Sequence, residues 1–394
     1  MNSILPPIAA VHPHSLTYHG DERIDPYYWL RDDTRSDPAV LDYLQAENGY
    51  TEAMLRPTEA LQKTLYQEMV DRQLPDDSSV PYYLKGYWYR SRYLPEQEYP
   101  LYERLAARPD APTELLLDGN QRAGDSDFYN LGALEISPSN HWMACSEDYV
   151  SRRQYQIRVR NLQTGDWLPD LVENTSGDVV WSADSAGFFY VRLDSETLLP
   201  YQVYYHTLGA ESAQDRLVYE EADNTYYLHI SHSRSEEYLL ISLSSTMSTE
   251  VHLLPLKIPH SSPTLFLARR RGHEYSLDHF QQQFYIRSNR EGRNFALYLA
   301  DDGAEQHWQA LLPVREHILL QDFVLFRNAL FVEERDAGLT RLRQLDLQGQ
   351  EVPEDSRQGN DHVHTGALQF LQRDRFCPGE PAITVKARLC PHQP

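Results

Sequence analysis

One serine, Ser126, has neighbours that partly match those of a catalytic nucleophile. A nucleophile elbow places small residues on both sides of a strained serine, in the pattern G-x-S-x-G, so that the hydroxyl stands clear of the sheet. Residues 124–128 read Gly-Asp-Ser-Asp-Phe, so the second glycine is missing. Because small polar residues of this kind are typical of turns, we interpret Ser126 as part of a polar turn. No other string in the sequence has the elbow pattern.

Two histidine-containing segments bear on metal binding. A zinc-binding helix carries H-E-x-x-H, because two imidazoles at this spacing share one helical face. The segment that starts with His273 and Glu274 has Leu277 where the second histidine is needed. Near the C-terminus, scattered possible ligands without a periodic pattern are more typical of a disordered tail than of a metal site. These residues are Asp361, His362, His364 and Cys377.

Paired carboxylates occur in the sequence as Asp32-Asp33, Glu220-Glu221 and Glu333-Glu334. Adjacent residues on a strand point to opposite faces, so these pairs do not indicate a shared acid and base. We interpret them as surface charge. Phosphate binding requires glycine-rich turns before helices, and the sequence has none. We therefore assign no catalytic, cofactor-binding or metal-binding residue and expect no cofactor.

The net charge of −22 excludes some classes of partner. A chain this acidic repels nucleic acid and anionic membrane surfaces, whereas cationic ligands suit it better. The compact basic runs, residues 152–153 and 269–271, are interpreted as solvated or paired with local acids. We expect neither a nucleic-acid nor a membrane partner.

The cysteines and the N-terminus bear on localisation. Three cysteines without a CxxC motif or paired spacing do not form a disulfide framework. No apolar run approaches the roughly 20 residues that span a bilayer, and the N-terminus does not have the pattern of a signal peptide. We predict a soluble, unexported, cytoplasmic protein.

The elements that would position any site repeat along the chain. Between residues 82 and 347 a pattern of alternating strand, polar turn and strand recurs six times, with a period of about 45 residues, which is typical of propeller blades. The 27 tyrosines, many of them in these runs, suit a pleated, half-buried surface. The predicted fold is mainly β, an incomplete propeller of the seven-bladed type. The six blades are predicted to start within residues 81–89, 134–143, 179–190, 226–231, 273–280 and 317–326.

A short helical segment is predicted before the blades. Pro38 opens one helix and Pro57 a second, in which Leu61, Leu65 and Met69 follow at i, i+4 and i+8. These apolar faces require a packing partner. We predict an N-terminal arm with helices over residues 1–75, a propeller of about six blades over 76–356, and a divergent tail, frameshifted or disordered, over 357–394.

Several strings resemble a known family. Residues 23–35 and 41–48 resemble the N-terminal signature of the prolyl oligopeptidase family, and residues 151–165, 198–206 and 273–279 resemble its oligopeptidase B (protease II) branch. The similarity covers about residues 8–350. The resemblance implies a seven-bladed propeller paired with an α/β-hydrolase domain. In that family a Ser, Asp and His of the hydrolase domain cleave short peptides after Lys or Arg, and the propeller restricts access to small peptides.

The resemblance also implies that the N-terminal helices pack on the hydrolase domain. That domain follows the propeller in the family, whereas this sequence ends at Pro394, so no triad residue can be transferred to it. We therefore expect a truncated peptidase, inactive alone, whose partners are short basic peptides and a hydrolase domain. Two alternatives stay open. One is a stand-alone propeller that binds basic peptides or a partner protein, and the other is complementation by a separately encoded hydrolase domain.

Overall fold

The structure is a computed structural model that describes residues 5–74, 76–108 and 110–352. The predicted tail, residues 357–394, lies outside the described residues, and so do its possible metal ligands. By its contacts the chain divides into two compact units, residues 1–75 and 76–394. Each unit is described by itself below.

The first unit contains a hairpin and two helices. Strand β1 (His14–Tyr18) pairs with β2 (Asp21–Asp25), and the short helix η1 (Tyr28–Leu30) follows. Helix α1 (Pro38–Leu55) begins where it does because the Asp37 side chain accepts a hydrogen bond from the Ala39 N–H and proline occupies the first turn. The turn η2 (Arg56–Thr58) connects it to α2 (Glu59–Asp71).

Helix α2 keeps its apolar residues in solvent. Leu61, Leu65 and Met69 are 57%, 46% and 58% exposed, so the predicted apolar face exists and is uncovered in the described residues. Among those residues no helix is both long enough and apolar enough to cross a membrane.

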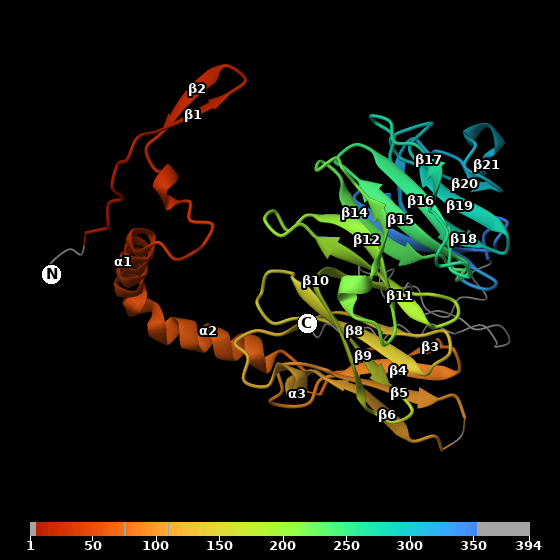
Figure 1. Cartoon of the computed structure of the whole chain (residues 1–394), viewed down its shortest axis with the longest axis horizontal. Coiled ribbons are helices and arrows are strands. Elements are labelled where there is room, and N and C mark those ends of the chain that lie inside the picture. The colour runs from red at the N-terminus through yellow and green to blue at the C-terminus, as the bar shows by residue number, and fades with distance from the viewer. Residues whose placement is uncertain (1–4, 75, 109, 353–394) are drawn as a thin grey trace. The chain divides into compact units, whose positions relative to one another are not determined.

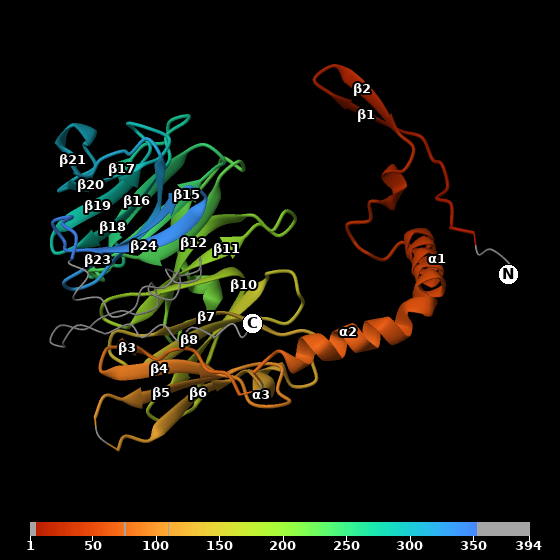
Figure 2. The same ribbon diagram turned by 180° about the vertical axis from the view of Figure 1, so that it is seen from behind.

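The second unit consists of antiparallel sheets, which we number as blades 1 to 6 (Figures 1 and 2). Blade 1 contains β3 (Tyr82–Leu84), β4 (Tyr87–Arg92), β5 (Leu101–Ala106) and β6 (Thr113–Asp118), and the short helix α3 (Gly119–Ala123) follows it. Blade 2 contains β7 (Asn130–Ile136), β8 (Trp142–Asp148), β9 (Tyr155–Asn161) and the first part of β10 (Trp167–Trp181). Blade 3 contains the last part of β10, β11 (Gly187–Leu193), β12 (Pro200–Thr207), the turn η3 (Ser212–Gln214) and β13 (Arg216–Glu220).

The remaining sheets follow the same order. Blade 4 contains β14 (Tyr227–His232), β15 (Tyr238–Ser244), β16 (Thr249–Pro255) and β17 (Thr264–Leu267). Blade 5 contains β18 (Tyr275–Phe280), β19 (Gln283–Ser288), β20 (Ala296–Ala300), the turn η4 (Glu305–His307) and β21 (Gln309–Leu312). Blade 6 contains β22 (Ile318–Leu325), β23 (Leu330–Asp336) and β24 (Leu339–Leu345). The prediction of a mainly β chain built from propeller blades is confirmed.

Blades 2 and 3 share one strand, which the repeat pattern alone does not predict. The 15-residue β10 pairs with β9 up to Thr175 and with β11 beyond it, with register shifts on both sides of this residue. Asn174 and Gly177, at φ 57° and 99°, provide the left-handed backbone that bends the strand there. The two blades therefore form a continuous seven-stranded sheet.

The apolar core lies between neighbouring blades. Between blades 3 and 4, for example, Phe189 and Val203 pack with Leu239 and Ile241, and all four are fully buried. Further apolar clusters join blades 1 to 2, 2 to 3, 4 to 5 and 5 to 6.

The first strands of successive blades contact one another. Trp181 Nε1 in β10 donates to the carbonyl of Glu135 in β7 at 3.0 Å, and Asp178 Oδ2 in β10 lies 2.9 Å from His229 Nδ1 in β14. The Arg234 N–H, just after β14, donates to Asp278 Oδ1 in β18 at 2.6 Å. These contacts place the first strands around a common axis, which we call the propeller axis.

A buried charged cluster joins the two halves of the seven-stranded sheet. His206 in β12 is fully buried, with Nδ1 2.8 Å from Asp215 Oδ1 and Nε2 3.0 Å from Asp170 Oδ1. Tyr190 donates to the other oxygen of Asp215, and the Gly209 N–H donates to Asp170. A neutral imidazole has a single N–H, so it would direct a lone pair at one carboxylate. Burial alone would lower the pKa of His206, but the hydrogen bonds to both aspartates raise it, so the imidazolium form is favoured.

We expect His206→Asn to lower the free energy of unfolding by about 3–5 kcal/mol, because two buried carboxylates then face each other without a cation. Since the pKa of His206 is raised, its contribution is fully present below its unfolded value of about 6.5 and is lost as the pH rises through the folded pKa. Melting curves across this pH range should show that loss in the parent chain and a weaker pH dependence in the variant.

The control for this prediction is His229→Asn. His229 also faces an aspartate, but its side chain is 61% exposed, so its replacement should cost about 1 kcal/mol or less. Equal melting temperatures for the two variants would contradict the assignment of His206 as a buried cation.

Candidate functional site

The structure places the candidate residues of the sequence analysis in separate locations. Ser126 follows the turn after α3, and its N–H donates to the carbonyl of Ala123 at 3.0 Å. His273 is 2% exposed, and its Nε2 lies 2.8 Å from Ser288 Oγ. Burial lowers the pKa of His273, and nearby Arg270 lowers it further. Within the described residues, no three His, Cys, Asp or Glu side chains are grouped so that they could hold a metal ion.

The interpretation of the paired carboxylates as surface charge is wrong for three of them. Glu221, Glu333 and Glu334 are 9%, 7% and 5% exposed. Glu334 accepts hydrogen bonds from Arg315 and, at 2.7 Å, from Arg343 Nη2. For Glu221 and Glu334 the physical reason is that the fold brings arginines distant in the sequence to these carboxylates, and sequence spacing does not show such partners.

Two residues of the basic run 269–271, Arg269 and Arg270, pair with acidic side chains, as predicted. Arg269 binds Glu221 and Glu250, with 2.9 Å between Arg269 Nη2 and Glu250 Oε1, and its guanidinium lies 3.9 Å from the centre of the Tyr226 ring. Although burial opposes ionisation, the hydrogen bonds from Arg269 lower the pKa of Glu250 to about 2. Arg270 forms two hydrogen bonds to Glu305.

Replacement of one buried carboxylate tests these networks. We expect Glu334→Gln to lower the free energy of unfolding by about 3–5 kcal/mol, because Arg315 and Arg343 lose their shared anion inside blade 6. The matched control is Glu316→Gln, in which an 88% exposed side chain changes and the cost should stay within about 0.5 kcal/mol. Urea denaturation of both variants gives the comparison, and similar midpoints would show that the network contributes little.

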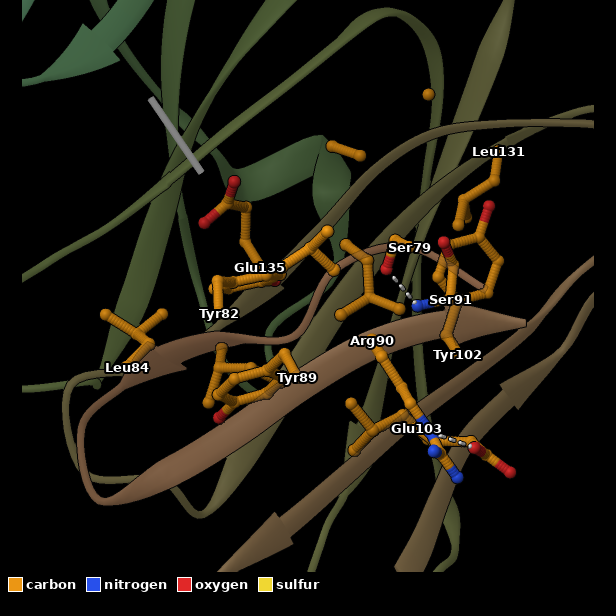
Figure 3. A pocket seen from close by; sticks show the side chains of 16 residues that line it. Ser79, Tyr82, Leu84, Tyr89, Arg90, Ser91, Tyr102, Glu103, Leu131 and Glu135 are labelled. Atoms are coloured by element: carbon orange, nitrogen blue, oxygen red, sulfur yellow. Dashed lines mark hydrogen bonds and ion pairs between the residues drawn. The ribbon is translucent and has the colours of Figure 1, made fainter. Parts of the chain in front are cut away.

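A cavity of about 300 Å³ lies between blades 1 and 2 (Figure 3). One wall is formed by residues 131–136, which include most of β7. The opposite wall comes from blade 1, where Arg90 Nε donates to Glu103 Oε2 at 2.8 Å, as the dashed line in Figure 3 shows. Arg92 Nη2 reaches the other oxygen of Glu103 at 3.5 Å. Tyr89 also lines the cavity, and burial raises the pKa of its hydroxyl.

The cavity combines apolar walls with a carboxylate that two arginines neutralise. Such a lining can bind and orient a small group, and its ionised side chains already have partners. No pattern in the sequence predicts this cavity. Its tyrosines follow the alternation of strand residues, and the contact between β7 and blade 1 has no local signal in the sequence.

Most of the chain matches one protein-family model. Residues 6–369 match the model described as "Prolyl oligopeptidase, N-terminal beta-propeller domain". The chain belongs to the prolyl oligopeptidase family. Among curated relatives, it is 39% identical over 366 residues to Dipeptidyl aminopeptidase BI of Pseudoxanthomonas mexicana, covering 88% of this chain and 50% of the relative. It is 31% identical over 386 residues to Protease 2 of Moraxella lacunata, covering 96% of this chain and 52% of the relative.

Solved structures of the prolyl oligopeptidase family have the same fold. Oligopeptidase B from Leishmania major is 30% identical, with a TM-score of 0.82, and the match covers 87% of this chain and 51% of that one. Oligopeptidase B from Trypanosoma brucei is 27% identical, with a TM-score of 0.80. The resemblance read from the sequence is therefore confirmed. The chain spans about half the length of the curated relatives it matches.

Proposed function

We propose that this chain is the propeller part of a peptidase of the prolyl oligopeptidase family and that it controls which peptides reach a hydrolase domain. The observation that carries this proposal is the match of residues 6–369 to the family's propeller domain. In this proposal the nucleophile, acid and histidine come from the hydrolase domain, and the 394 residues alone do not hydrolyse peptides. Without a positioned nucleophile and oxyanion hole, little rate enhancement is available.

The proposed substrates are short peptides with basic residues, cleaved after Lys or Arg. A net charge of −22 attracts cationic peptides, and two similar solved structures carry the name oligopeptidase B. A relative at 39% identity carries the name dipeptidyl aminopeptidase, so removal of N-terminal dipeptides is the competing activity. Three cysteines without a CxxC motif or paired spacing favour a reducing compartment, and we propose the cytoplasm.

Activity assays of the chain alone and with a hydrolase domain test this function. The purified 394-residue chain should not hydrolyse an arginyl reporter peptide or a dipeptidyl reporter. Mixing it with the hydrolase half of Protease 2 from Moraxella lacunata should give turnover that a serine-directed inhibitor abolishes. The preferred reporter then identifies the cleavage type.

Two outcomes would count against this function. Turnover by the chain alone, abolished by the same inhibitor, would place the catalytic machinery within these residues. Tight binding of cationic peptides by the chain, without association with the hydrolase half, would favour a stand-alone binding module.

The apolar face of α2 is the proposed contact with the hydrolase domain. We expect Leu65→Gln with Met69→Gln to weaken association with the hydrolase half at least about tenfold, since two side chains that are about half exposed in the chain would lose their burial in the complex. Because both positions are exposed in the chain, its melting temperature should change little. Lys63→Gln on the same helix is the control. Unchanged association of the double variant, measured by titration calorimetry, would exclude this face.

A further inference from the structure

The turns that follow the first strand of each blade meet at one end of the propeller axis. Because these strands have equivalent positions in their blades, their turns share one end, which we call the turn end. Neighbouring turns are hydrogen-bonded: Asn140 Nδ2 donates to the carbonyl of Lys85 at 3.1 Å, and the Ser139 N–H donates to Ser185 Oγ at 3.0 Å. These contacts join blades 1 to 2 and 2 to 3.

The same kind of contact continues on the other side of the axis. The Ser235 N–H in the turn of blade 4 donates to the carbonyl of His279 in blade 5 at 2.8 Å. Gln281 Nε2 in blade 5 lies 3.3 Å from the carbonyl of Arg327 in blade 6. Hydrogen bonds at this end thus join the turn of blade 4 to the end of β18 in blade 5, and the turn of blade 5 to blade 6.

Two further contacts join blades that are not neighbours. Lys85 Nζ in the turn of blade 1 lies 3.1 Å from Glu236 Oε1 in the turn of blade 4. The guanidinium of Arg234 in blade 4 lies 5.5 Å from the ring centre of Phe326 in blade 6. Blades 2 and 3 separate blade 1 from blade 4 along the chain, so turns of these two blades can meet only across the axis. The Lys85–Glu236 ion pair therefore crosses the turn end.

The backbone holds both partners in defined positions. Lys85 and Gly86 have φ of 49° and 88°, which fits a tight two-residue hairpin turn with little freedom. Glu236 also has positive φ, at 55°. The Lys85 side chain is 15% exposed and that of Glu236 is 37% exposed, so water partly screens their attraction. Such a pair is weak enough to break and re-form.

We propose that the Lys85–Glu236 ion pair closes the turn end of the propeller axis to peptides and that peptides therefore approach from the opposite end. The inference rests on the proposed function as a propeller that controls peptide access. In this proposal the side chains of Lys85 and Glu236 exclude bulky molecules from the turn end. It also predicts that high salt loosens this end, because the pair is partly exposed.

Thiol labelling of β14 tests the proposal on the chain itself. Tyr227 and Ser231 lie on the same face of this strand, four residues and about 13 Å apart, and Ser231 is the nearer to the turn end. Ser231→Cys is prepared in a chain in which Cys377 and Cys390 are replaced by Ser. The third native cysteine, Cys145, is buried, so it can stay in place. The labelling rate at position 231 is measured with a bulky polyethylene-glycol maleimide and with the small reagent iodoacetamide. The ratio of the first rate to the second reports how well a bulky molecule reaches this position.

We expect this ratio to rise about fivefold when Lys85→Met or Glu236→Gln is added, the factor that a partly exposed ion pair worth about 1 kcal/mol supplies. The matched control is Tyr227→Cys, at the far end of the same strand, whose ratio should not change. The double reversal Lys85→Glu with Glu236→Lys should restore slow labelling if it melts like the parent chain.

An unchanged ratio at position 231 in both single variants would overturn the proposal. An equal rise at position 227 would also overturn it, because that result indicates general loosening of the blades. Labelling does not depend on hydrolysis, so the labelling result can be interpreted even if the peptidase assay fails. The two proposals can therefore fail separately.

Discussion

Each blade is a small antiparallel sheet with two apolar faces, and neither face can be buried within the blade itself. Burial comes only from the next blade, so the fold depends on correct stacking of neighbours. Polar contacts mark these boundaries. Arg160 reaches the carbonyl of Leu116 between blades 2 and 1, Arg216 that of Pro259 between blades 3 and 4, and Arg287 that of Leu320 between blades 5 and 6. Where blades 2 and 3 are continuous, His206 in β12 binds Asp170 in β10 and Asp215 just before β13.

Much of this fold could be predicted from the sequence. Apolar and polar residues that alternate with period two indicate strands, and polar turns at regular spacing indicate repeated hairpins. The mainly β propeller was therefore predicted correctly. Asp37 and Pro38 are local signals that act within one helical turn, so the start of α1 was also predicted. The strand shared by blades 2 and 3 was missed, since residues 173–177 have the composition of a turn, although β10 continues through them with a bend.

The site was less accessible to sequence reasoning, because its features depend on partners distant in the chain. Glu221 and Glu334 look like surface charge until the fold brings Arg269 and Arg343 to them. Likewise, Lys85 and Glu236 are about 150 positions apart in the sequence and have no shared motif. Long sequence segments that resemble known proteins identify the family. That resemblance does not assign roles to the side chains of Lys85, Glu236 or the buried glutamates.

The buried ion pairs also limit which blades can be neighbours. The apolar faces of the blades resemble one another, so hydrophobic burial alone distinguishes poorly between a correct and an incorrect stacking order. Arg269, just after β17, binds the buried Glu221 in the connection before blade 4. The Arg270–Glu305 pair at blade 5 is half exposed on the arginine side and contributes less to this selection. A blade stacked on the wrong neighbour would leave such a charge buried without its partner, at a cost of about 3–5 kcal/mol. Each ion pair therefore penalises incorrect orders by more than it stabilises the correct one, which suits a repeat fold that has to assemble in a single sequence of blades.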